Sequence, residues 1–411
     1  MKILRIGGVN LPTSRFLDVL TRTDIERLII LLSPHDSQNI KELYNTARFF
    51  GVEHLLSKLE IIMLPKLKIW SKILKKVGKQ FTLKRLVRLA YSYIAKQIID
   101  HYKKINFDAI WVGDNDFDGS NDLFVGIAER FQSRVPIVRS YKETRFIRRW
   151  EEYVTLREAS HIIVPSPAYL EFFYDLYGIT LKRVSFADVD WRYSKTVDWV
   201  KALKVEKLSQ KDRVPHVCIL TGRALSSPSE RRSGFRYYYV PIIRELISRN
   251  IAVHLHAKNI LTDQRGRNLY AEIERRSDLF HIEKPLNLTA GSIDYAILKR
   301  YDAGIMHPKV PEEYSALERF QQINIPNRFY EYLMADVVPL VLVGSGKEME
   351  RLVIEKDYGI LFADYDDLAT QLCKLVKRKE KKRVELQEIK TYKDFADVLV
   401  QAILAVRQGG E

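Results

Sequence analysis

The stretch Ile325-Pro-Asn-Arg-Phe-Tyr-Glu-Tyr-Leu-Met-Ala-Asp-Val-Val-Pro-Leu-Val341 joins a helical pattern directly to an apolar run. Pro326 suits the start of a helix, because proline lacks the N–H group that would be unpaired in the first turn. Phe329, Tyr332 and Leu333 supply a packing face, and residues 338–343 are typical of a buried strand. The stretch therefore predicts a helix followed closely by a strand of a parallel sheet.

Apolar runs and amphipathic stretches alternate on both sides of this element, as expected for parallel sheets covered by helices. In the first half, strands are expected at residues 3–6, 27–32, 61–64, 109–112, 136–138, 162–164 and 184–186. In the second half, they are expected at 217–221, 252–257, 279–282, 303–306, 338–343 and 360–362, with helices at 238–248, 269–275, 293–299 and 327–335. This pattern predicts an α/β protein with two Rossmann-like, doubly wound domains that face each other across a cleft.

The length of 411 residues also favours two domains, since single domains usually run to about 100–200 residues. We expect a first domain at 1–195, with a basic helical insertion at about 66–104. A polar, Lys-rich linker is expected at 196–214, because this stretch contains no clear strand pattern. The second domain is expected at 215–385, and residues 386–411 as a C-terminal helix that could pack back on the first domain.

Composition narrows the class of protein. The net charge of +15 indicates an anionic partner, which could be nucleic acid, lipid headgroups or a phosphorylated substrate. Cys218 and Cys373 are the only cysteines and lie at no metal-ligand spacing, which favours a reducing cytosol over a disulfide or zinc framework. No apolar run approaches the roughly 20 residues of a spanning helix, and the start does not resemble a signal peptide. We therefore expect a cytoplasmic protein.

The helix that begins near Pro326 has a further chemical implication. The unpaired N–H groups and partial positive charge of a helix N-terminus suit a diphosphate. Glu331, one turn inside, could accept hydrogen bonds from the two hydroxyls of a ribose. The alternative is a surface helix with an ordinary solvated glutamate.

These residues resemble a known family. The segment is similar to the P-x-K-x-x-E-Y-x-x-x-x-x-P-V element of the GT-B glycosyltransferases, most closely the retaining glycosyltransferase group 1 family, also called GT4. The resemblance implies that Glu331 binds the nucleotide ribose, and it places Asn327 and Arg328 at the nucleotide. It implies transfer of a sugar from a UDP- or GDP-linked donor to a glycan or lipid-linked acceptor.

The same family carries a Gly-Arg after the first strand of its second domain and a Lys-Gly before the next helix. By resemblance, Arg223 matches the first cation, and Arg232 is the nearest match to the second, with Arg231 and Arg236 close beside it. Two arginines can hold a departing diphosphate bidentately without a metal, so no divalent ion is expected to be required. The alternative is a basic, solvated loop.

Weaker agreements run in the family's order along the chain. Gly7 and Gly8 follow the first expected strand, where they would let the backbone approach a ligand, although a tight turn explains them equally well. The stretches 160–166, 187–191, 301–308 and 357–368 resemble family elements at strand ends. The glycine pattern is not the G-x-G-x-x-G fingerprint, which argues against a nicotinamide dehydrogenase.

Some positions depart from the family pattern. Ile323 stands where the first glutamate of the E-x7-E motif is expected, Asp336 replaces a glycine, and no histidine follows residues 136–138. Asp114, Asp116, Asp118 or Glu143 could instead orient an acceptor hydroxyl, or the aspartates could simply form a polar loop with Asx turns. The spacing Asp-x-Asp also imitates a metal motif of the other glycosyltransferase fold, but the repeat of two α/β halves argues against that fold.

The segment from Lys66 to Lys104 contains twelve basic residues and one acidic residue, interleaved with apolar side chains. Such a segment could lie on an anionic membrane surface, which would suit a lipid-linked or cell-surface glycan acceptor and a peripheral location. It could equally be a helical pair that packs on the first domain and solvates its charges.

Other functions remain open. They are a GT-B epimerase or phosphorylase, and a non-catalytic protein that binds nucleotide sugars or nucleic acid. No RNA-binding signature is evident, so nucleic acid is not the expected partner.

Overall fold

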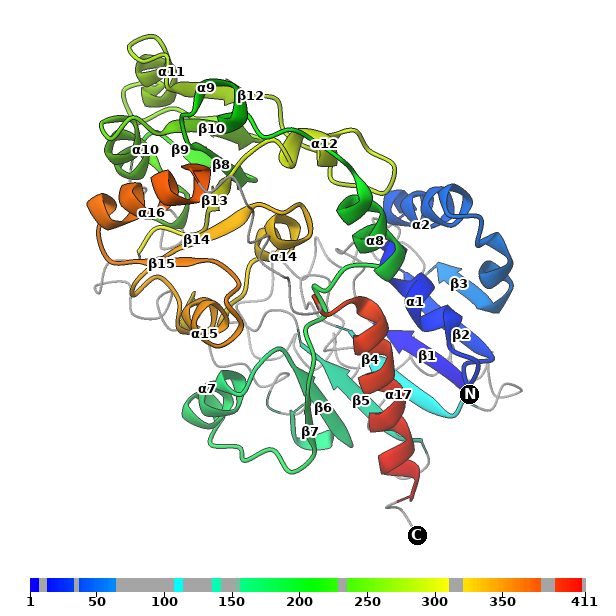
Figure 1. The fold of residues 1–411 in the computed structure, drawn as a ribbon. Coiled ribbons are helices and arrows are strands. Elements are labelled where there is room, and N and C mark those ends of the chain that lie inside the picture. The colour runs from blue at the N-terminus through cyan, green and yellow to red at the C-terminus, as the bar shows by residue number, and fades with distance from the viewer. Residues whose placement is uncertain are drawn as a thin grey trace. The chain divides into compact units, whose positions relative to one another are not determined.

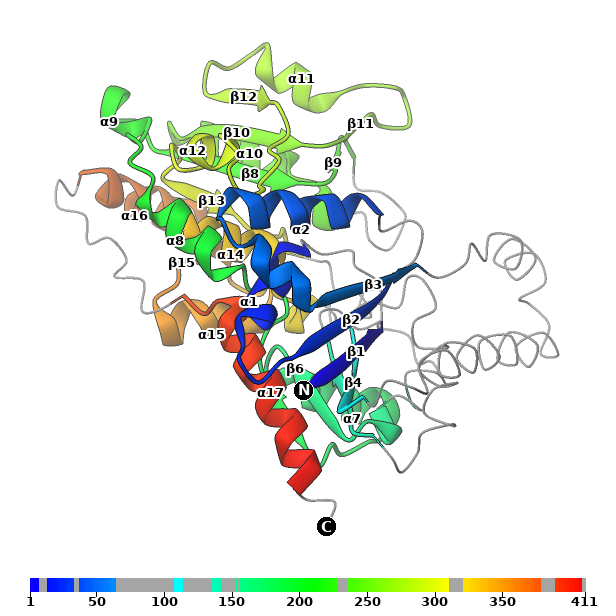
Figure 2. The same ribbon diagram turned by 90° about the vertical axis from the view of Figure 1, so that its right-hand side faces the viewer.

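The computed structural model describes residues 1–6, 13–32, 37–63, 107–113, 135–141, 153, 156–227, 235–309, 321–377 and 389–408. The chain divides into two compact units, shown in Figure 1 and, from the side, in Figure 2. Unit 1 comprises Met1–Ser194 with Lys390–Glu411, and unit 2 comprises Lys195–Ile389. The basic segment 66–104 lies outside the described residues.

Unit 1 is built on a parallel sheet whose described strands follow the order β3-β2-β1-β4-β5-β6-β7. The strands are β1 (Lys2–Ile6), β2 (Arg27–Leu32), β3 (Leu59–Met63), β4 (Ala109–Val112), β5 (Ile137–Ser140), β6 (His161–Val164) and β7 (Val184–Phe186). Strand β1 pairs with β2 on one side and with β4 on the other, so the strand order reverses between β1 and β4. Open α/β sheets bind ligands at the carboxyl edge of such a switch point.

Helices cover this sheet and complete its core. They are the 3-10 helices η1 (Thr13–Arg15) and η3 (Glu53–Lys58), together with α1 (Phe16–Thr21), α2 (Ser37–Phe49), α7 (Ala168–Tyr177) and α17 (Tyr392–Gln408). The indole of Trp111, on β4, lies 5.9 Å from the ring of Phe16 on α1 and 5.7 Å from that of Phe395 on α17. The apolar face of α17 is thus part of the core of unit 1 (Figure 1).

Unit 2 repeats the plan with a parallel sheet in the order β12-β10-β8-β13-β14-β15. Its strands are β8 (His216–Thr221), β10 (Ala252–Ala257), β12 (Phe280–Glu283), β13 (Ala303–Ile305), β14 (Val338–Leu342) and β15 (Ile360–Phe362). Strand β8 lies between β10 and β13, so the switch point of unit 2 is between β8 and β13. The two-residue strands β9 (Ala224–Leu225) and β11 (Ile260–Leu261) pair separately.

The remaining elements in the described part of unit 2 are helical. They are α8 (Ser194–Ala202), α9 (Ser209–Asp212), η4 (Phe235–Tyr237), α10 (Val240–Ile247), α11 (Leu269–Glu274), α12 (Asp294–Leu298), α14 (Asn327–Met334), α15 (Lys347–Lys356) and α16 (Tyr365–Lys377). Most of α8 and all of α9 lie in the stretch 196–214 that was expected to be a linker. The ammonium group of buried Lys299 donates to the carbonyls of Val200 (2.9 Å) and Lys201 (3.3 Å) and pairs with Asp336 at 2.9 Å. A cation at the C-terminal carbonyls of a helix complements its dipole, so Lys299 fixes the end of α8 to the body of unit 2.

Imidazole rings stack across the amino half of the same sheet. The rings of His216, His254 and His281, on β8, β10 and β12, lie 5.2 and 4.8 Å apart in order. His216 Nδ1 and His254 Nε2 are 2.9 Å apart, and His254 Nδ1 lies 3.2 Å from Glu283 Oε1. Burial, reinforced by the neighbouring histidines, lowers the pKa of His254 from 6.5 to about 3. This histidine is therefore neutral in the folded protein.

The predicted α/β class with two Rossmann-like units is confirmed. Each expected strand is present with its ends shifted by at most two residues, because strands buried on both faces appear as continuous apolar runs. The short strands β9 and β11 were not expected, because a strand of two residues is too short to show an alternating pattern of apolar and polar residues. Within the described ranges, no helix combines the length and apolar composition that crossing a bilayer requires.

Candidate nucleotide site at the switch point of unit 2

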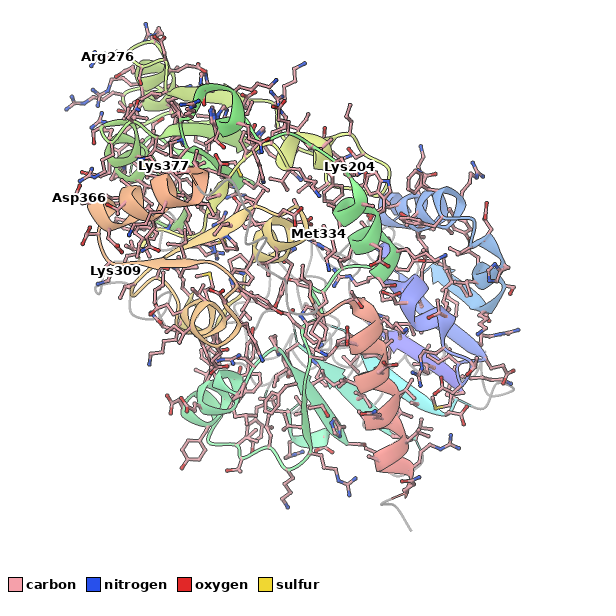
Figure 3. All side chains as sticks on the ribbon, in the orientation of Figure 1. Lys204, Arg276, Lys309, Met334, Asp366 and Lys377 are labelled. Atoms are coloured by element: carbon pink, nitrogen blue, oxygen red, sulfur yellow. The ribbon has the colours of Figure 1, made fainter. Side chains whose placement is uncertain are left out.

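Helix α14 is inserted at the carboxyl end of the switch point. Strands β8 and β13 pair only at Val217–Ala303 and Cys218–Gly304. Beyond that point, side chains of α14 satisfy the main chain of β8. The hydroxyl of Tyr332 accepts from the N–H of Leu220 at 3.0 Å, and Arg328 donates from Nη1 to the carbonyl of Leu220 at 2.7 Å. These two contacts, from the first and the second turn of α14, hold the helix against the end of β8. In Figure 3, Met334 labels the last residue of α14.

Gly304 makes this insertion possible. A Cβ atom at residue 304 would lie within 2.7 Å of three ring carbons of Tyr332, closer than such contacts occur. Tyr332 is fully buried, and burial raises the pKa of its phenol well above the usual value of 10. The glycine of the Tyr301-Asp-Ala-Gly segment is therefore required by the close approach of a neutral aromatic ring.

A buried histidine follows β13 and lies between two arginines. His307 Nδ1 is 2.7 Å from Nη2 of Arg328, and His307 Nε2 is 3.3 Å from Nη2 of Arg236. Burial, followed by the charges of Arg328 and Arg236, lowers the pKa of His307 well below 6.5. A neutral imidazole has one acceptor nitrogen and one donor N–H. The short contact assigns the acceptor to Arg328, so the ring offers no second lone pair to Arg236. The guanidinium groups of Arg328 and Arg236 thus lie at the two nitrogens of a ring that carries no negative charge.

Glu331 is also on α14, one turn after Arg328. Its side chain is buried, with 6% of the residue exposed. The hydroxyl of Tyr295, on α12, lies 3.1 Å from Glu331 Oε2 and 3.2 Å from the carbonyl of Leu288. The indole of Trp199, on α8, meets the ring of Tyr295 edge-on at 5.8 Å. A buried carboxylate is therefore held by a phenol that is itself fixed by packing.

Arg223 lies in the loop that follows β8. The hydroxyl of Thr221 accepts from the N–H of Arg223 at 3.3 Å and donates to its carbonyl at 2.7 Å, which shapes the turn. The side chain is exposed, and its guanidinium group has no hydrogen bond or ion pair with any part of the chain that the structure describes. A cation in this position is available to a ligand.

Asn327 is the first residue of α14 and is half-buried. The N-cap residue is Pro326, which makes no side-chain capping bond to the helix. The first N–H groups of α14 are therefore not capped by the residue in that position, as suits a helix start that receives an anion.

The structure shows the surroundings of two residues that depart from the family pattern, Ile323 and Asp336. Ile323 is buried, with 6% exposed, and so supplies packing where a glutamate was expected. Asp336 has a φ of 55°, in the left-handed region that favours glycine. Aspartate tolerates this conformation better than most residues, and here it also pairs with buried Lys299.

The other predicted site residues lie outside the described residues. They are Gly7, Gly8, Asp114, Asp116, Asp118, Glu143 and Arg232. The structure does describe Arg5 and Gly113, which precede Gly7 and Asp114 in the sequence. The guanidinium of Arg5, on β1, lies between the rings of Phe16 (4.9 Å) and Trp111 (4.5 Å). It also passes so close to Gly113 that an added Cβ there would lie within 2.7 Å of it.

Sequence reasoning did not single out His307 or Tyr295. It gave Tyr332 only a packing role, and it named Arg236 only as a neighbour of Arg232. Histidine after a strand and tyrosine in an amphipathic helix are ordinary core residues, so no local signal marks them. Their importance comes from contacts between segments that are 21 to 112 residues apart.

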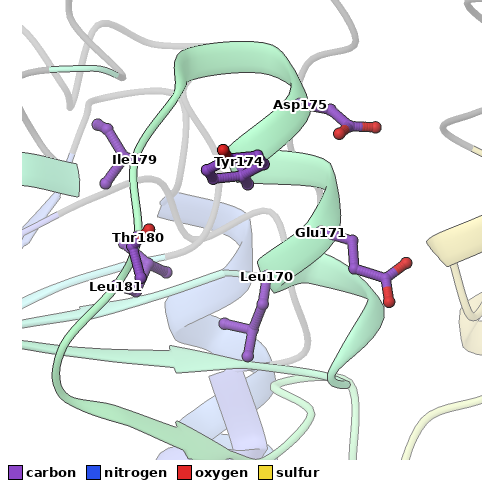
Figure 4. Close-up of a pocket in the computed structure, with 7 residues that line it drawn as sticks. All are labelled: Leu170, Glu171, Tyr174, Asp175, Ile179, Thr180 and Leu181. Carbon is purple, nitrogen blue, oxygen red and sulfur yellow. The ribbon is translucent and has the colours of Figure 1, made fainter.

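A surface groove of about 450 Å³ lies elsewhere, in unit 1 (Figure 4). Its lining comes from α7 and the turn that follows: Leu170, Glu171, Tyr174, Asp175, Ile179, Thr180 and Leu181. It contains none of the predicted site residues. Within the described ranges, no three His, Cys, Asp or Glu side chains are grouped so that they could hold a metal ion.

No family model matches the sequence, and no curated protein matches it. Solved structures do match over the full length. A glycosyltransferase from Rickettsia africae is 12% identical with a TM-score of 0.57, covering 99% of this chain and 96% of its own. Anabaena HepE in complex with UDP-glucose is 13% identical with a TM-score of 0.51, covering 100% and 99%. S. aureus MnaA with UDP is 12% identical with a TM-score of 0.50, covering 98% and 97%.

At such low identity the likeness concerns the fold. Two parallel sheets, each with its own switch point, run through the whole alignment with proteins of this architecture. The chain therefore has the GT-B fold of two Rossmann-like units.

Proposed function

We propose that the protein is a glycosyltransferase that uses a nucleoside-diphosphate sugar as donor, with UDP or GDP as the nucleotide. The observation that carries the proposal is the convergence at the switch point of unit 2. Arg236 and Arg328 flank the neutral His307 there. The buried carboxylate of Glu331 lies one turn after Arg328 on α14. Solved structures of the same fold, among them HepE and MnaA, contain UDP or UDP-glucose, which supports a nucleotide ligand of this kind.

The cations divide into two roles in this proposal. Arg223, with its exposed guanidinium, and Arg236 would bind the diphosphate together with Arg232. Arg328 already donates to Leu220 and His307, so it is a positioning residue that keeps α14 and His307 in place. The start of α14, with Asn327 as its first residue, would complete the anion site through its N–H groups.

Glu331 would accept hydrogen bonds from the ribose hydroxyls. A carboxylate that is mostly withdrawn from water binds hydroxyl donors strongly, because such bonds are charge-assisted. The nucleoside would then lie between this carboxylate and the arginines that hold its diphosphate.

The reaction breaks the bond between the sugar's anomeric carbon and the β-phosphate oxygen, and forms a bond from that carbon to an acceptor oxygen. The acceptor hydroxyl loses its proton, and the nucleoside diphosphate leaves with the bonding electrons. Arginines aimed at the diphosphate would stabilise this developing charge without a metal. Retention of configuration is proposed from the family resemblance alone.

The acceptor side is assigned to unit 1. Gly7 and Gly8 would allow close approach of the backbone, and Asp114, Asp116 or Glu143 would orient the acceptor hydroxyl. A glycan or lipid-linked acceptor would fit a cytoplasmic enzyme whose segment 66–104 touches an anionic membrane surface.

Glu331→Ala tests the donor assignment. Loss of a charge-assisted hydrogen bond costs about 1.5–3 kcal/mol, which corresponds to roughly 10- to 150-fold weaker binding. Isothermal titration of UDP and GDP against the wild type and the variant measures this, with Glu355→Ala on the exposed face of α15 as the matched control. Unchanged affinity in the Glu331 variant would refute the assignment.

Product analysis separates transfer from the alternatives. A UDP- or GDP-sugar is incubated with and without a glycan acceptor, and the products are identified by mass spectrometry and NMR. Release of nucleoside diphosphate that depends on the acceptor supports transfer, whereas an isomerised sugar nucleotide formed without acceptor indicates an epimerase.

A further inference from the structure

We propose that Tyr295 is a specificity-determining residue for the ribose, which acts by orienting the carboxylate of Glu331. The proposal rests on the proposed function, because it assumes that Glu331 receives the nucleoside. It assigns a role to a side chain on α12 that no sequence motif marks.

The geometry singles out one proton. The hydroxyl of Tyr295 has a single hydrogen, and the acceptors within its reach include Glu331 Oε2 at 3.1 Å and the carbonyl of Leu288 at 3.2 Å. The carboxylate is the stronger acceptor, since a hydrogen bond to an ionised group is roughly twice as strong as one between neutral groups. Both residues are buried, with Tyr295 only 1% exposed, so water competes poorly for this bond.

The donor is rigid as well as close. Trp199 meets the ring of Tyr295 edge-on at 5.8 Å and at 83°, a favoured aromatic geometry. Trp199 is on α8, whose C-terminal carbonyls are bound by Lys299, so the packing partner is itself fixed to unit 2. The phenol therefore holds Oε2 in one place, which sets the plane of the carboxylate around its terminal bond.

This plane matters because ribose presents two adjacent hydroxyls. A carboxylate in a fixed plane can accept hydrogen bonds from both hydroxyls at once. A carboxylate that rotates freely binds them more weakly, because its rotational entropy is lost on binding. A site built to bind a hydroxyl also discriminates against a ligand that lacks it, because its own polar group is then left unpaired. Tyr295 should thus affect ribonucleotides more than 2′-deoxyribonucleotides.

Tyr295→Phe tests the proposal, with titrations of UDP, GDP and their 2′-deoxy counterparts. We expect the variant to bind whichever ribonucleotide the wild type prefers about tenfold more weakly, and its 2′-deoxy form less than threefold more weakly. In the Glu331→Gln background, adding Tyr295→Phe should change neither affinity further.

Tyr301→Phe is the matched control. It removes an equally buried phenol hydroxyl, which bonds to His256 Nε2 at 2.8 Å and makes no contact with Glu331. Its ratio of ribo to deoxy affinity should equal that of the wild type. Thermal unfolding of each variant checks that it folds. If Tyr295→Phe does not fold, Trp199→Phe provides the same measurement, since it loosens the ring but keeps the hydroxyl.

The outcomes separate the two hypotheses. Equal weakening of the ribo and deoxy ligands by Tyr295→Phe would assign Tyr295 a purely structural role at the loop of Leu288 and overturn this inference. If Glu331→Gln abolishes the discrimination while Tyr295→Phe leaves it intact, the inference fails and the proposed function stands. If the wild type binds neither nucleotide, both fail.

Discussion

Gly304→Ala should disrupt the switch point of unit 2 from inside its sheet. The added methyl would lie within 2.7 Å of three ring carbons of Tyr332. That ring cannot easily retreat, because it is fully buried and its hydroxyl accepts from Leu220. Overpacking of this kind costs about 1–3 kcal/mol, and displacing the hydroxyl from a buried N–H adds about 1–3 kcal/mol.

A total of about 2–6 kcal/mol is therefore expected. For a unit of this size, 1 kcal/mol corresponds to roughly 2–4 °C, so the melting transition of unit 2 should fall by about 4–24 °C. Differential scanning calorimetry is the suitable assay, because it can resolve separate transitions in a chain with two units. Nucleotide binding should weaken too, since displaced α14 carries Arg328 and Glu331.

Two comparisons make the prediction specific. Gly222→Ala adds a methyl with no heavy atom within 4 Å, so its melting temperature should stay close to that of the wild type. Tyr332→Leu is destabilising by itself, but it removes the ring that Gly304→Ala strikes. The double variant should therefore be about as stable as Tyr332→Leu alone. Strict additivity of the two changes, or a Gly304→Ala protein as stable as the wild type, would refute the steric argument.

Two further predictions concern stability. Lys299→Met should lower the free energy of unfolding by about 2–4 kcal/mol in urea titrations, because the carbonyls at the end of α8 and Asp336 lose their buried cation; a loss below 0.5 kcal/mol would contradict this role. His254 has a folded pKa of about 3, below the unfolded 6.5, so the unfolded state binds the extra proton. Its contribution to stability is complete above pH 6.5 and is lost as the pH falls towards 3, with about 2 kcal/mol gone by pH 5. His254→Gln should flatten this part of the pH–stability curve, and an equally steep curve in the variant would show that other groups cause the loss.

The strands and α14 could be predicted because their causes are local. Pro326 marks the start of the helix, and the run at β14 is apolar whichever partner strands it has. Asp336 shows which kind of feature the local sequence does not predict. Its departure from glycine is visible in the sequence, but the ion pair that accompanies it comes from Lys299, 37 residues away.

The candidate site in unit 2 was only partly predictable for the same reason. Glu331 follows from its spacing after Pro326, yet the phenol that holds it belongs to another helix. The environment of His307 depends on one arginine before β10 and one on α14, so it exists only after the sheet of unit 2 has formed. The roles of Gly7, Gly8, Asp114, Asp116, Glu143 and Arg232 stay predictions.

Helix α17 has a consequence for how the chain matures. The side chains that cover Trp111 and Phe16 include Phe395 and Tyr392, which a ribosome adds only after all of unit 2. During synthesis, residues 1–194 therefore lack part of their hydrophobic core until nearly two hundred further residues have been made. Translation that stops before residue 390 would leave that interior open to water, and such a fragment should be a substrate for chaperones and proteases even when unit 2 is intact.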